Sequence, residues 1–347
     1  MRRGGVRTKA AFVVEPQRVE IREIPEPQVG PKDVLLKVHA AGICGSDLHL
    51  YRGQHAFRKL PAILGHEMAG EVVSVGAEVH RIKVGMAATV LPQIGCGRCQ
   101  ACAAGYPNVC PNKTVPGTPA WQGTFADYFM APEETVFPLP EGLGFVEGAL
   151  AEPLAVAVHV TRRLELERGQ SLAILGSGTI GLLILSVAKY LGADPIVSTD
   201  ALEYNLQVAR QLGASVTVNV LKDNVEQAAG ELTNGWGMHA AVIATGAPNI
   251  IDQATAITAR RGKICLVGMM SKPIPVQTYN FVAKEITLVG SQTYTADDFE
   301  KAVELLAEGA INTNELITKV VPFAATAQAM ETLDQRKENA VKIIVKM

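Results

Sequence analysis

The sequence predicts a two-domain α/β protein in which one domain is a doubly wound parallel sheet. Up to about residue 150, short apolar segments alternate with glycine and proline clusters, which is typical of β structure. From about residue 151, apolar strands alternate with helical segments, and this order implies crossovers that cover both faces of a parallel sheet. A chain of 347 residues is long enough for about two such domains.

The first region is expected to be rich in strands, and breaks such as Pro25-Glu-Pro27 separate them. Its predicted strands are residues 10–14, 19–24, 34–40 and 71–75. In the second region the predicted strands are residues 171–175, 196–199, 216–218, 241–244 and 264–267, and the predicted helices are 180–191 and 203–212.

The C-terminal tail resembles the first region more than the second. Phe299, Val303 and Leu306 mark one face of a helix that ends near Gly309, and a last strand covers 341–345. We therefore expect one discontinuous domain, residues 1–150 and 290–347, and a second domain, residues 151–289.

Composition excludes several function classes. The formal net charge is -2 and the basic residues are scattered, so no nucleic-acid partner is expected. The uncharged stretch 171–188 contains glycines and fits a strand, turn and helix better than a membrane span. The clustered thiols fit a reducing cytoplasm, so we expect a cytoplasmic protein without a membrane partner.

Four cysteines form a dense cluster in residues 95–111. Cys96, Cys99, Cys102 and Cys110 have the spacing C-x2-C-x2-C-x7-C, which suits a tetrahedral zinc held by thiolates. Such a zinc has no open position for substrate, so this cysteine lobe is expected to be structural. The alternative is a set of reduced, unrelated thiols.

A glycine turn follows the first strand of the second region. In Gly176-Ser-Gly178-Thr179-Ile180-Gly181, the first glycine permits the tight turn, the second lets the backbone approach a pyrophosphate, and the third allows close packing of helix and strand. The N-terminus of the next helix offers free N–H groups to phosphates. The pattern predicts a Rossmann domain.

Asp200 ends the next predicted strand, where a carboxylate can accept hydrogen bonds from ribose hydroxyls. It would repel a 2′-phosphate, and Ala201 offers no cation to neutralise one, so NAD is favoured over NADP. The alternative role for Asp200 is a helix N-cap. Thr245, Val267 and Gly268 complete the residues that we expect to bind the cofactor.

A second metal site is indicated by Cys44, His66 and Glu67. One thiolate, one imidazole and a carboxylate match a catalytic zinc that keeps an open position. By themselves these three residues are equally compatible with no metal at all.

Together these segments resemble the zinc-dependent medium-chain dehydrogenase/reductase family, in its polyol and secondary-alcohol branch. The resemblance covers nearly the whole chain, including the Cys44 loop, Gly65-His66-Glu67, the cysteine lobe and Ala151-Glu152-Pro153-Leu154. It implies a GroES-like distorted β-barrel domain with two zincs, a Rossmann domain, and an active site in the cleft between them.

The resemblance also implies roles for single residues. Cys44 and His66 would bind catalytic zinc, and Glu152 stands where relatives have a third ligand or a carboxylate that binds water. Glu67 matches a carboxylate that binds the metal directly in some relatives and indirectly in others, and the two glutamates can exchange. Asp47 would accept from the second nitrogen of His66.

In such an enzyme, zinc lowers the pKa of the alcohol, and NAD takes the hydride. Ser46 matches a hydroxyl relay for the proton and His49 its solvent end, with the cofactor ribose between them. The alternative for His49 is an ordinary surface residue. His159 is expected to be a packed core histidine rather than a ligand.

The substrate is expected to be a small alcohol or polyol. Residues 291–298 lack the arginine with which polyol dehydrogenases often hold distal hydroxyls, which disfavours a sorbitol-like substrate and favours a smaller diol or secondary alcohol. Candidate pocket residues are Tyr51, Phe57, Trp121 and Tyr294.

Two rival functions remain open. One is a threonine-type dehydrogenase of an amino alcohol, and the other is a non-catalytic, zinc-stabilised NAD-binding protein. The zinc-free quinone reductase branch conflicts with the cysteine lobe. We expect a homotetramer or a homodimer, with the cysteine lobe bracing a subunit contact.

Overall fold

The computed structural model describes residues 7–55, 58–270 and 273–347. The chain divides into two compact units. Unit 1 consists of Met1–Glu152, Thr295–Glu308 and Ile317–Met347, and unit 2 consists of Pro153–Tyr294 and Gly309–Leu316. The chain therefore leaves unit 1 after Glu152 and again after Glu308, and it returns to unit 1 each time.

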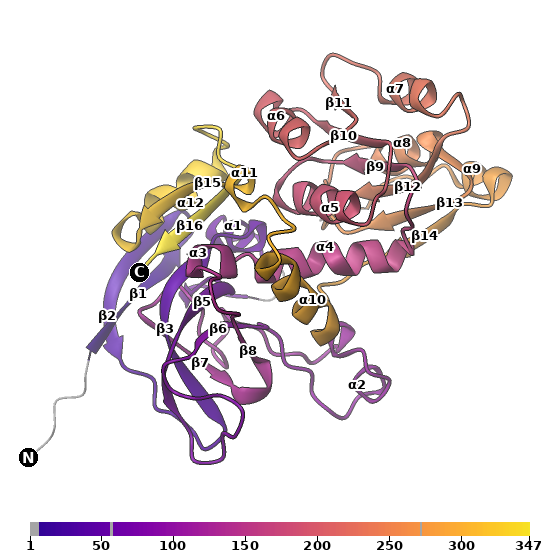
Figure 1. Cartoon of the computed structure of the whole chain (residues 1–347). Helices are drawn as coiled ribbons and strands as arrows, with labels where there is room; N and C mark the ends of the chain where they lie inside the picture. The colour runs from indigo at the N-terminus through magenta and orange to yellow at the C-terminus, as the bar shows by residue number, and fades with distance from the viewer. Residues whose placement is uncertain (1–6, 56–57, 271–272) are drawn as a thin grey trace, which may run out of the picture. The chain divides into compact units, whose positions relative to one another are not determined.

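Unit 1 is built on two sheets (Figure 1). The larger has seven strands in the order β15-β16-β3-β5-β6-β8, with β7 also paired to β3, and the smaller has the order β2-β1-β4. The strands are β1 (Arg7–Glu15), β2 (Arg18–Pro25), β3 (Asp33–Gly42), β4 (Ala62–Ile63), β5 (Glu67–Val75), β6 (Ala87–Val90), β7 (Tyr128–Pro132), β8 (Val136–Pro138), β15 (Ile317–Pro322) and β16 (Lys342–Lys346).

The last strand of the chain lies beside an early one in this sheet. β16 pairs antiparallel with β3, with Ile344 opposite Gly42. The helical segments of unit 1 are short, apart from α10 and α12. They are α1 (Gly45–Tyr51), α2 (Gln100–Ala103), α3 (Phe145–Gly148), α10 (Ala296–Ala307), α12 (Thr326–Asp334) and three single turns at Pro107–Val109, Glu133–Thr135 and Phe323–Ala325.

Unit 2 contains one six-stranded sheet, in which every strand pair is parallel. Its order is β11-β10-β9-β12-β13-β14. The strands are β9 (Leu172–Leu175), β10 (Ile196–Asp200), β11 (Val216–Asn219), β12 (Met238–Ile243), β13 (Thr258–Leu266) and β14 (Thr287–Gly290). The order reverses at β9, so the carboxyl ends of β9 and β12 form a switch point where α/β sheets bind ligands.

Two groups of helices cover this sheet in the manner of a doubly wound fold. Apolar residues of α7, α8 and α9 share one core cluster with the strands, and α5, α6 and α11 contact one another as a second group (Figure 1). The helices are α5 (Thr179–Tyr190), α6 (Glu203–Gln211), α7 (Val225–Leu232), α8 (Ile250–Ile257), α9 (Thr278–Lys284) and α11 (Thr313–Leu316), and α4 (Ala151–Leu164) spans the junction of the two units.

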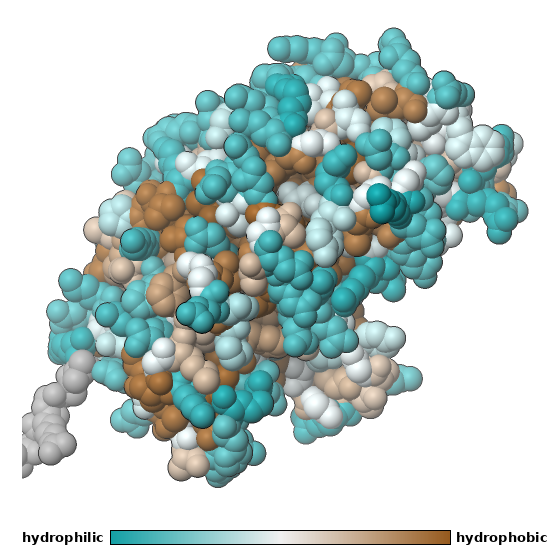
Figure 2. Space-filling model, viewed as in Figure 1, coloured by the Kyte–Doolittle hydropathy of each residue, from teal (hydrophilic) through white to brown (hydrophobic). Residues whose placement is uncertain are grey.

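The predicted α/β class with a parallel-sheet domain is confirmed, and each predicted strand and helix lies within a few residues of an observed one. No helix among residues 7–55, 58–270 and 273–347 is long and apolar enough to cross a membrane. Figure 2 shows hydrophilic side chains over much of the visible surface, with apolar residues in smaller patches between them.

Candidate metal and cofactor sites

Cys44, His66 and Glu67 come together at one end of the large sheet of unit 1. One ligand atom from each lies within 4.8 Å of the others, and both His66 and Glu67 are buried. The register of the sheet causes this grouping, because Gly42 at the end of β3 lies opposite Glu67 at the start of β5. A thiolate, an imidazole and a carboxylate at this separation fit a zinc ion with a free coordination position.

Asp47 connects the two chain segments that carry these residues. It is fully buried, and its Oδ2 accepts a hydrogen bond from the Cys44 N–H at 3.1 Å. Its Oδ1 accepts from the Gly65 N–H at 3.3 Å and lies 3.4 Å from His66 Nδ1. Because Nδ1 faces a carboxylate, the Nε2 nitrogen of His66 is the one left for a metal.

The charges around Asp47 shift the pKa values of this group. Burial alone would raise the pKa of Asp47, but the neighbouring charges of His66 and Arg58 hold it below its ordinary value. Burial likewise opposes protonation of His66, yet Asp47 and Cys44 together raise its pKa well above the usual range. Arg58, whose Nη1 lies 3.8 Å from Asp47 Oδ1, is itself buried.

The two candidate glutamates have different surroundings. Glu67 forms a buried ion pair with Lys342 of β16. Glu152 is also buried and lies in the first turn of α4. Within the part of the chain that the structure describes, Glu152 does not belong to the group whose ligand atoms lie within 4.8 Å of one another.

Ser46 and His49 both lie on α1, directly after Cys44, and both are half-buried. His159 belongs to neither cluster of metal-ligating side chains, as predicted. It is not packed in the core, however, because it lies on a partly exposed face of α4 and is half-buried there.

The suggested pocket residues are mostly core residues. Tyr51 and Trp121 belong to the main apolar cluster of unit 1, and Tyr294 is fully buried at 1 % exposure. Phe57 lies outside the described residues. The proposal that aromatic side chains line a substrate pocket therefore has no support from Tyr51 or Trp121, because both pack against other apolar side chains.

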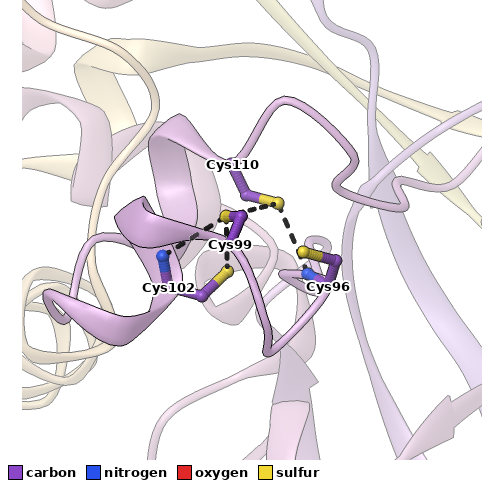
Figure 3. A group of neighbouring side chains, drawn as sticks. All are labelled: Cys96, Cys99, Cys102 and Cys110. Atoms are coloured by element: carbon purple, nitrogen blue, oxygen red, sulfur yellow. Dashed lines mark hydrogen bonds between the residues drawn. The ribbon is translucent and has the colours of Figure 1, made fainter.

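The four cysteines of the lobe converge on one point (Figure 3). Cys99 Sγ lies 3.5 Å from Cys102 Sγ and 3.7 Å from Cys110 Sγ. Tetrahedral zinc with Zn–S bonds of about 2.3 Å requires sulfur separations of about 3.8 Å, so the sulfur positions fit this ion. All six cysteines of the chain are free thiols.

Backbone N–H groups point at the same sulfurs. Cys110 Sγ accepts from the N–H groups of Cys96 and Asn112, each at 3.4 Å. Hydrogen bonds from the backbone, led by Arg98, lower the pKa of Cys96 to about 6, whereas burial and Cys99 raise the pKa of Cys102 to about 11. Donors of this kind favour thiolates, which are the form that binds zinc.

The glycines of the turn in unit 2 differ in backbone conformation and in the space around them. Gly176 has a φ of 107°, which side chains disfavour. A Cβ on Gly181 would lie only 1.9 Å from the Gly176 carbonyl oxygen, whereas a Cβ on Gly178 would meet nothing within 4 Å. The space at Gly178 lies at the N-terminus of α5, where backbone donors favour a pyrophosphate.

The other expected cofactor residues follow neighbouring strands. Asp200 ends β10, and its Oδ2 accepts from the Ser177 N–H of the turn at 2.9 Å. Asp200 is not the N-cap of α6, a position that Leu202 takes. Thr245 and Gly268 follow β12 and β13, and a Cβ on Gly268 would lie 2.8 Å from the Thr245 carbonyl oxygen. Val267 donates its N–H to Ile243 of β12 at 3.1 Å.

Sequence reasoning missed Lys342 and Arg58. The signal for Lys342 was a lysine within the apolar run Val341-Lys-Ile-Ile-Val345, where a buried charge needs a partner. Arg58 stands in no recognisable motif.

Known proteins support one family for this chain. Residues 30–141 match the alcohol dehydrogenase GroES-like domain, and residues 179–308 match the zinc-binding dehydrogenase domain. Sorbitol dehydrogenase from Bacillus subtilis is 36% identical over 342 residues, which are 97% of this chain and 96% of that protein. The chain belongs to the zinc-dependent medium-chain dehydrogenase/reductase family.

Further relatives place it in the polyol and secondary-alcohol branch of this family. D-arabitol-phosphate dehydrogenase from Enterococcus avium is 34% identical, with 93% of this chain and 92% of that protein covered. The solved structure of 2R,3R-butanediol dehydrogenase from Bacillus subtilis is 33% identical with a TM-score of 0.90, and the match covers 98% of this chain and 99% of that one. This medium-chain dehydrogenase is thus an NAD-linked oxidoreductase of alcohols or polyols.

Proposed function

We propose that this chain oxidises a secondary hydroxyl of a small diol or polyol to the ketone, with NAD as cofactor and two zinc ions per chain. The observation that carries the proposal is the convergence of Cys44, His66 and Glu67, with ligand atoms within 4.8 Å of one another. A protein that only binds NAD has no need of an open metal site, so this cluster disfavours a purely structural role.

The two zinc ions have different tasks in this proposal. Cys44 and His66 hold the catalytic ion, with Glu67 or Glu152 as the third, exchangeable ligand, and the four-cysteine lobe holds the structural ion. When bound, the catalytic zinc supplies Lewis acidity that favours loss of the substrate's hydroxyl proton, and NAD accepts the hydride. Asp47 keeps the His66 ring in one orientation through its contact with Nδ1.

Ser46 and His49 are proposed to carry the substrate proton to solvent. Both lie on α1 within five residues of Cys44 and are half-buried. A hydroxyl can accept and donate in turn, and an imidazole exchanges protons near neutral pH. The last turn of α1 thereby gives the proton a route away from the metal group.

The pyrophosphate is proposed to bind at Gly176, Gly178 and Gly181 and to the N–H groups of Thr179 and Ile180. Asp200 is proposed to bind the adenosine ribose. Asp200 Oδ1 accepts the Leu202 N–H, and Oδ2 accepts the Ser177 N–H and the side-chain amide of Asn205. A carboxylate has lone pairs for about four hydrogen bonds, so one acceptor position remains for a ribose hydroxyl. Thr245, Val267 and Gly268 complete this surface, and the carboxylate disfavours NADP.

The substrate class is proposed as a secondary alcohol or short polyol. Residues 291–298 contain no arginine that would hold distal hydroxyls, which favours a smaller diol such as butanediol over sorbitol. The subunits are proposed to form a homotetramer or a homodimer. Tyr106 and Val109 of the cysteine lobe are exposed, which supports a subunit contact there and can be tested by light scattering.

A metal count combined with an activity panel tests this function. Zinc is measured in the wild type and in Cys44→Ser, and NADH production is followed with sorbitol, xylitol, butanediol and threonine. We expect two zincs per wild-type chain, one in the variant, and activity only in the wild type. An active, metal-free wild type refutes the proposal, and a preference for threonine assigns the protein to amino alcohols instead.

A further inference from the structure

Lys342 is a buried charged side chain beside the candidate metal group, at 1 % exposure. Its Nζ pairs with Glu67 Oε2 and donates a hydrogen bond to the Ile43 carbonyl oxygen at 3.0 Å. Glu67 is equally buried, at 1 % exposure. A buried lysine and glutamate are stable only as a pair, because either charge alone would be desolvated without compensation.

Glycine makes room for this pair. A Cβ on Gly42 would lie 1.9 Å from Glu67 Oε2 and 3.0 Å from Lys342 Cε. Gly42 lies opposite Glu67 in the β3–β5 register, and β16 pairs with the same end of β3, where the Ile43 N–H donates to the Ile343 carbonyl oxygen at 3.1 Å. Three strands thus converge where the ion pair lies.

Lys342 contacts both segments that carry the candidate ligands. Ile43 directly precedes Cys44, and Glu67 directly follows His66. Its ammonium group also competes with any metal for the Glu67 carboxylate, since Oε2 already has a cationic partner. The pairing with Lys342 therefore restrains the orientation of the Glu67 carboxylate and offsets its negative charge.

We propose that Lys342 is a positioning residue that restrains Glu67, so that this carboxylate binds catalytic zinc only weakly and the substrate position stays open. The inference rests on the proposed function. In this proposal Lys342, from the last strand of the chain, decides whether Glu67 or Glu152 is the third zinc ligand. Without the ammonium group, a buried Glu67 has the zinc as its remaining cation and binds it persistently.

The test is the rate of zinc release from Lys342→Met, measured with a chromogenic chelator on the full-length enzyme. Release from the lobe is subtracted with the Cys44→Ser variant. We expect release from the catalytic site to slow about tenfold, a typical size for changes behind a metal ligand, together with a lower kcat. Substitution with Co²⁺ should give a weaker visible absorption in the variant, as coordination number increases.

Four further variants make the outcome decisive. Lys342→Arg keeps the charge and should release zinc as the wild type does. The double variant Lys342→Met, Glu67→Gln removes both charges and tests the inference if Lys342→Met alone fails to fold. The double variant should release zinc no more slowly than Glu67→Gln does. Lys346→Met changes an exposed lysine of the same strand and should have no effect.

Unchanged zinc release and an unchanged Co²⁺ spectrum in Lys342→Met overturn the inference. So does slower release in the double variant than in Glu67→Gln, because no Glu67 carboxylate is then present. If Cys44→Ser contains as much zinc as the wild type, the proposed function itself is refuted. The two failures are therefore distinguishable.

Discussion

Asp47 Oδ1 lies 3.4 Å from His66 Nδ1, and both side chains are buried. The same carboxylate accepts the N–H groups of Cys44 and Gly65. One side chain therefore faces the imidazole and hydrogen-bonds to both segments that carry the candidate zinc ligands.

Replacing Asp47 with asparagine should weaken catalytic-site zinc affinity by about 10–100-fold, because the amide keeps the size of the carboxylate but loses its charge. Competition with a chelator measures this affinity. Asp127→Asn is a matched control, since Asp127 accepts from Thr8 and Lys9 instead. Equal zinc affinity in both variants would show that Asp47 does not act on His66.

The glycines of the turn should respond differently to alanine. Gly181→Ala places a methyl group 1.9 Å from the Gly176 carbonyl oxygen and should destabilise unit 2, whereas Gly178→Ala meets nothing within 4 Å and should fold normally. Its methyl group then occupies the space proposed for the pyrophosphate, so NAD affinity should fall. Thermal unfolding and NAD titration separate the two effects. Normal NAD binding by Gly178→Ala would contradict the proposed cofactor position.

Cofactor preference should reverse in the double variant Asp200→Ser, Ala201→Arg. The substitution removes a charge that repels a 2′-phosphate and adds one that attracts it. We expect the NAD/NADP ratio of kcat/KM to change by about 100-fold, which corresponds to about 2.7 kcal/mol. The check is steady-state kinetics with both cofactors. Because Asp200 also accepts the Ser177 N–H, stability is measured in parallel, and an unaltered ratio in a folded variant counts against Asp200.

His49→Ala should depress alcohol oxidation most at low pH. If His49 delivers the proton to solvent, its loss matters most where hydroxide and buffer base are scarce. The measurement is the pH profile of kcat, with His80→Ala as control because His80 is an exposed histidine of the same unit. A profile with the wild-type shape removes His49 from the mechanism.

His55 should make the protein less stable as the pH falls. Burial and the nearby Arg58 charge lower its pKa from 6.5 to about 4 in the folded protein. Below pH 6.5 the unfolded chain binds a proton that the folded chain does not, so the free energy of unfolding decreases from pH 6.5 to about 4. His55→Gln should lose less stability than the wild type over this range in denaturant titrations. A parallel decrease in both proteins would disprove the assignment.

Local spacing made several features predictable from sequence. The glycine turn and the cysteine lobe are each formed by residues close together in the chain, so their geometry depends on short loops. The alternation of strands and helices likewise predicted the parallel sheet. The pairing of β15 with β16 was not predicted, because it depends on contacts between separate segments of the chain.

The sequence by itself determined the fold class, the glycine turn and the lobe, since hydrophobic period and residue spacing are local properties. Only the tertiary structure decided which charges are buried together. Glu67 and Lys342 are 275 residues apart, and they meet because β5 and β16 both pair with β3. Strand register over such separations is set by packing of the whole sheet, which no motif in the chain encodes.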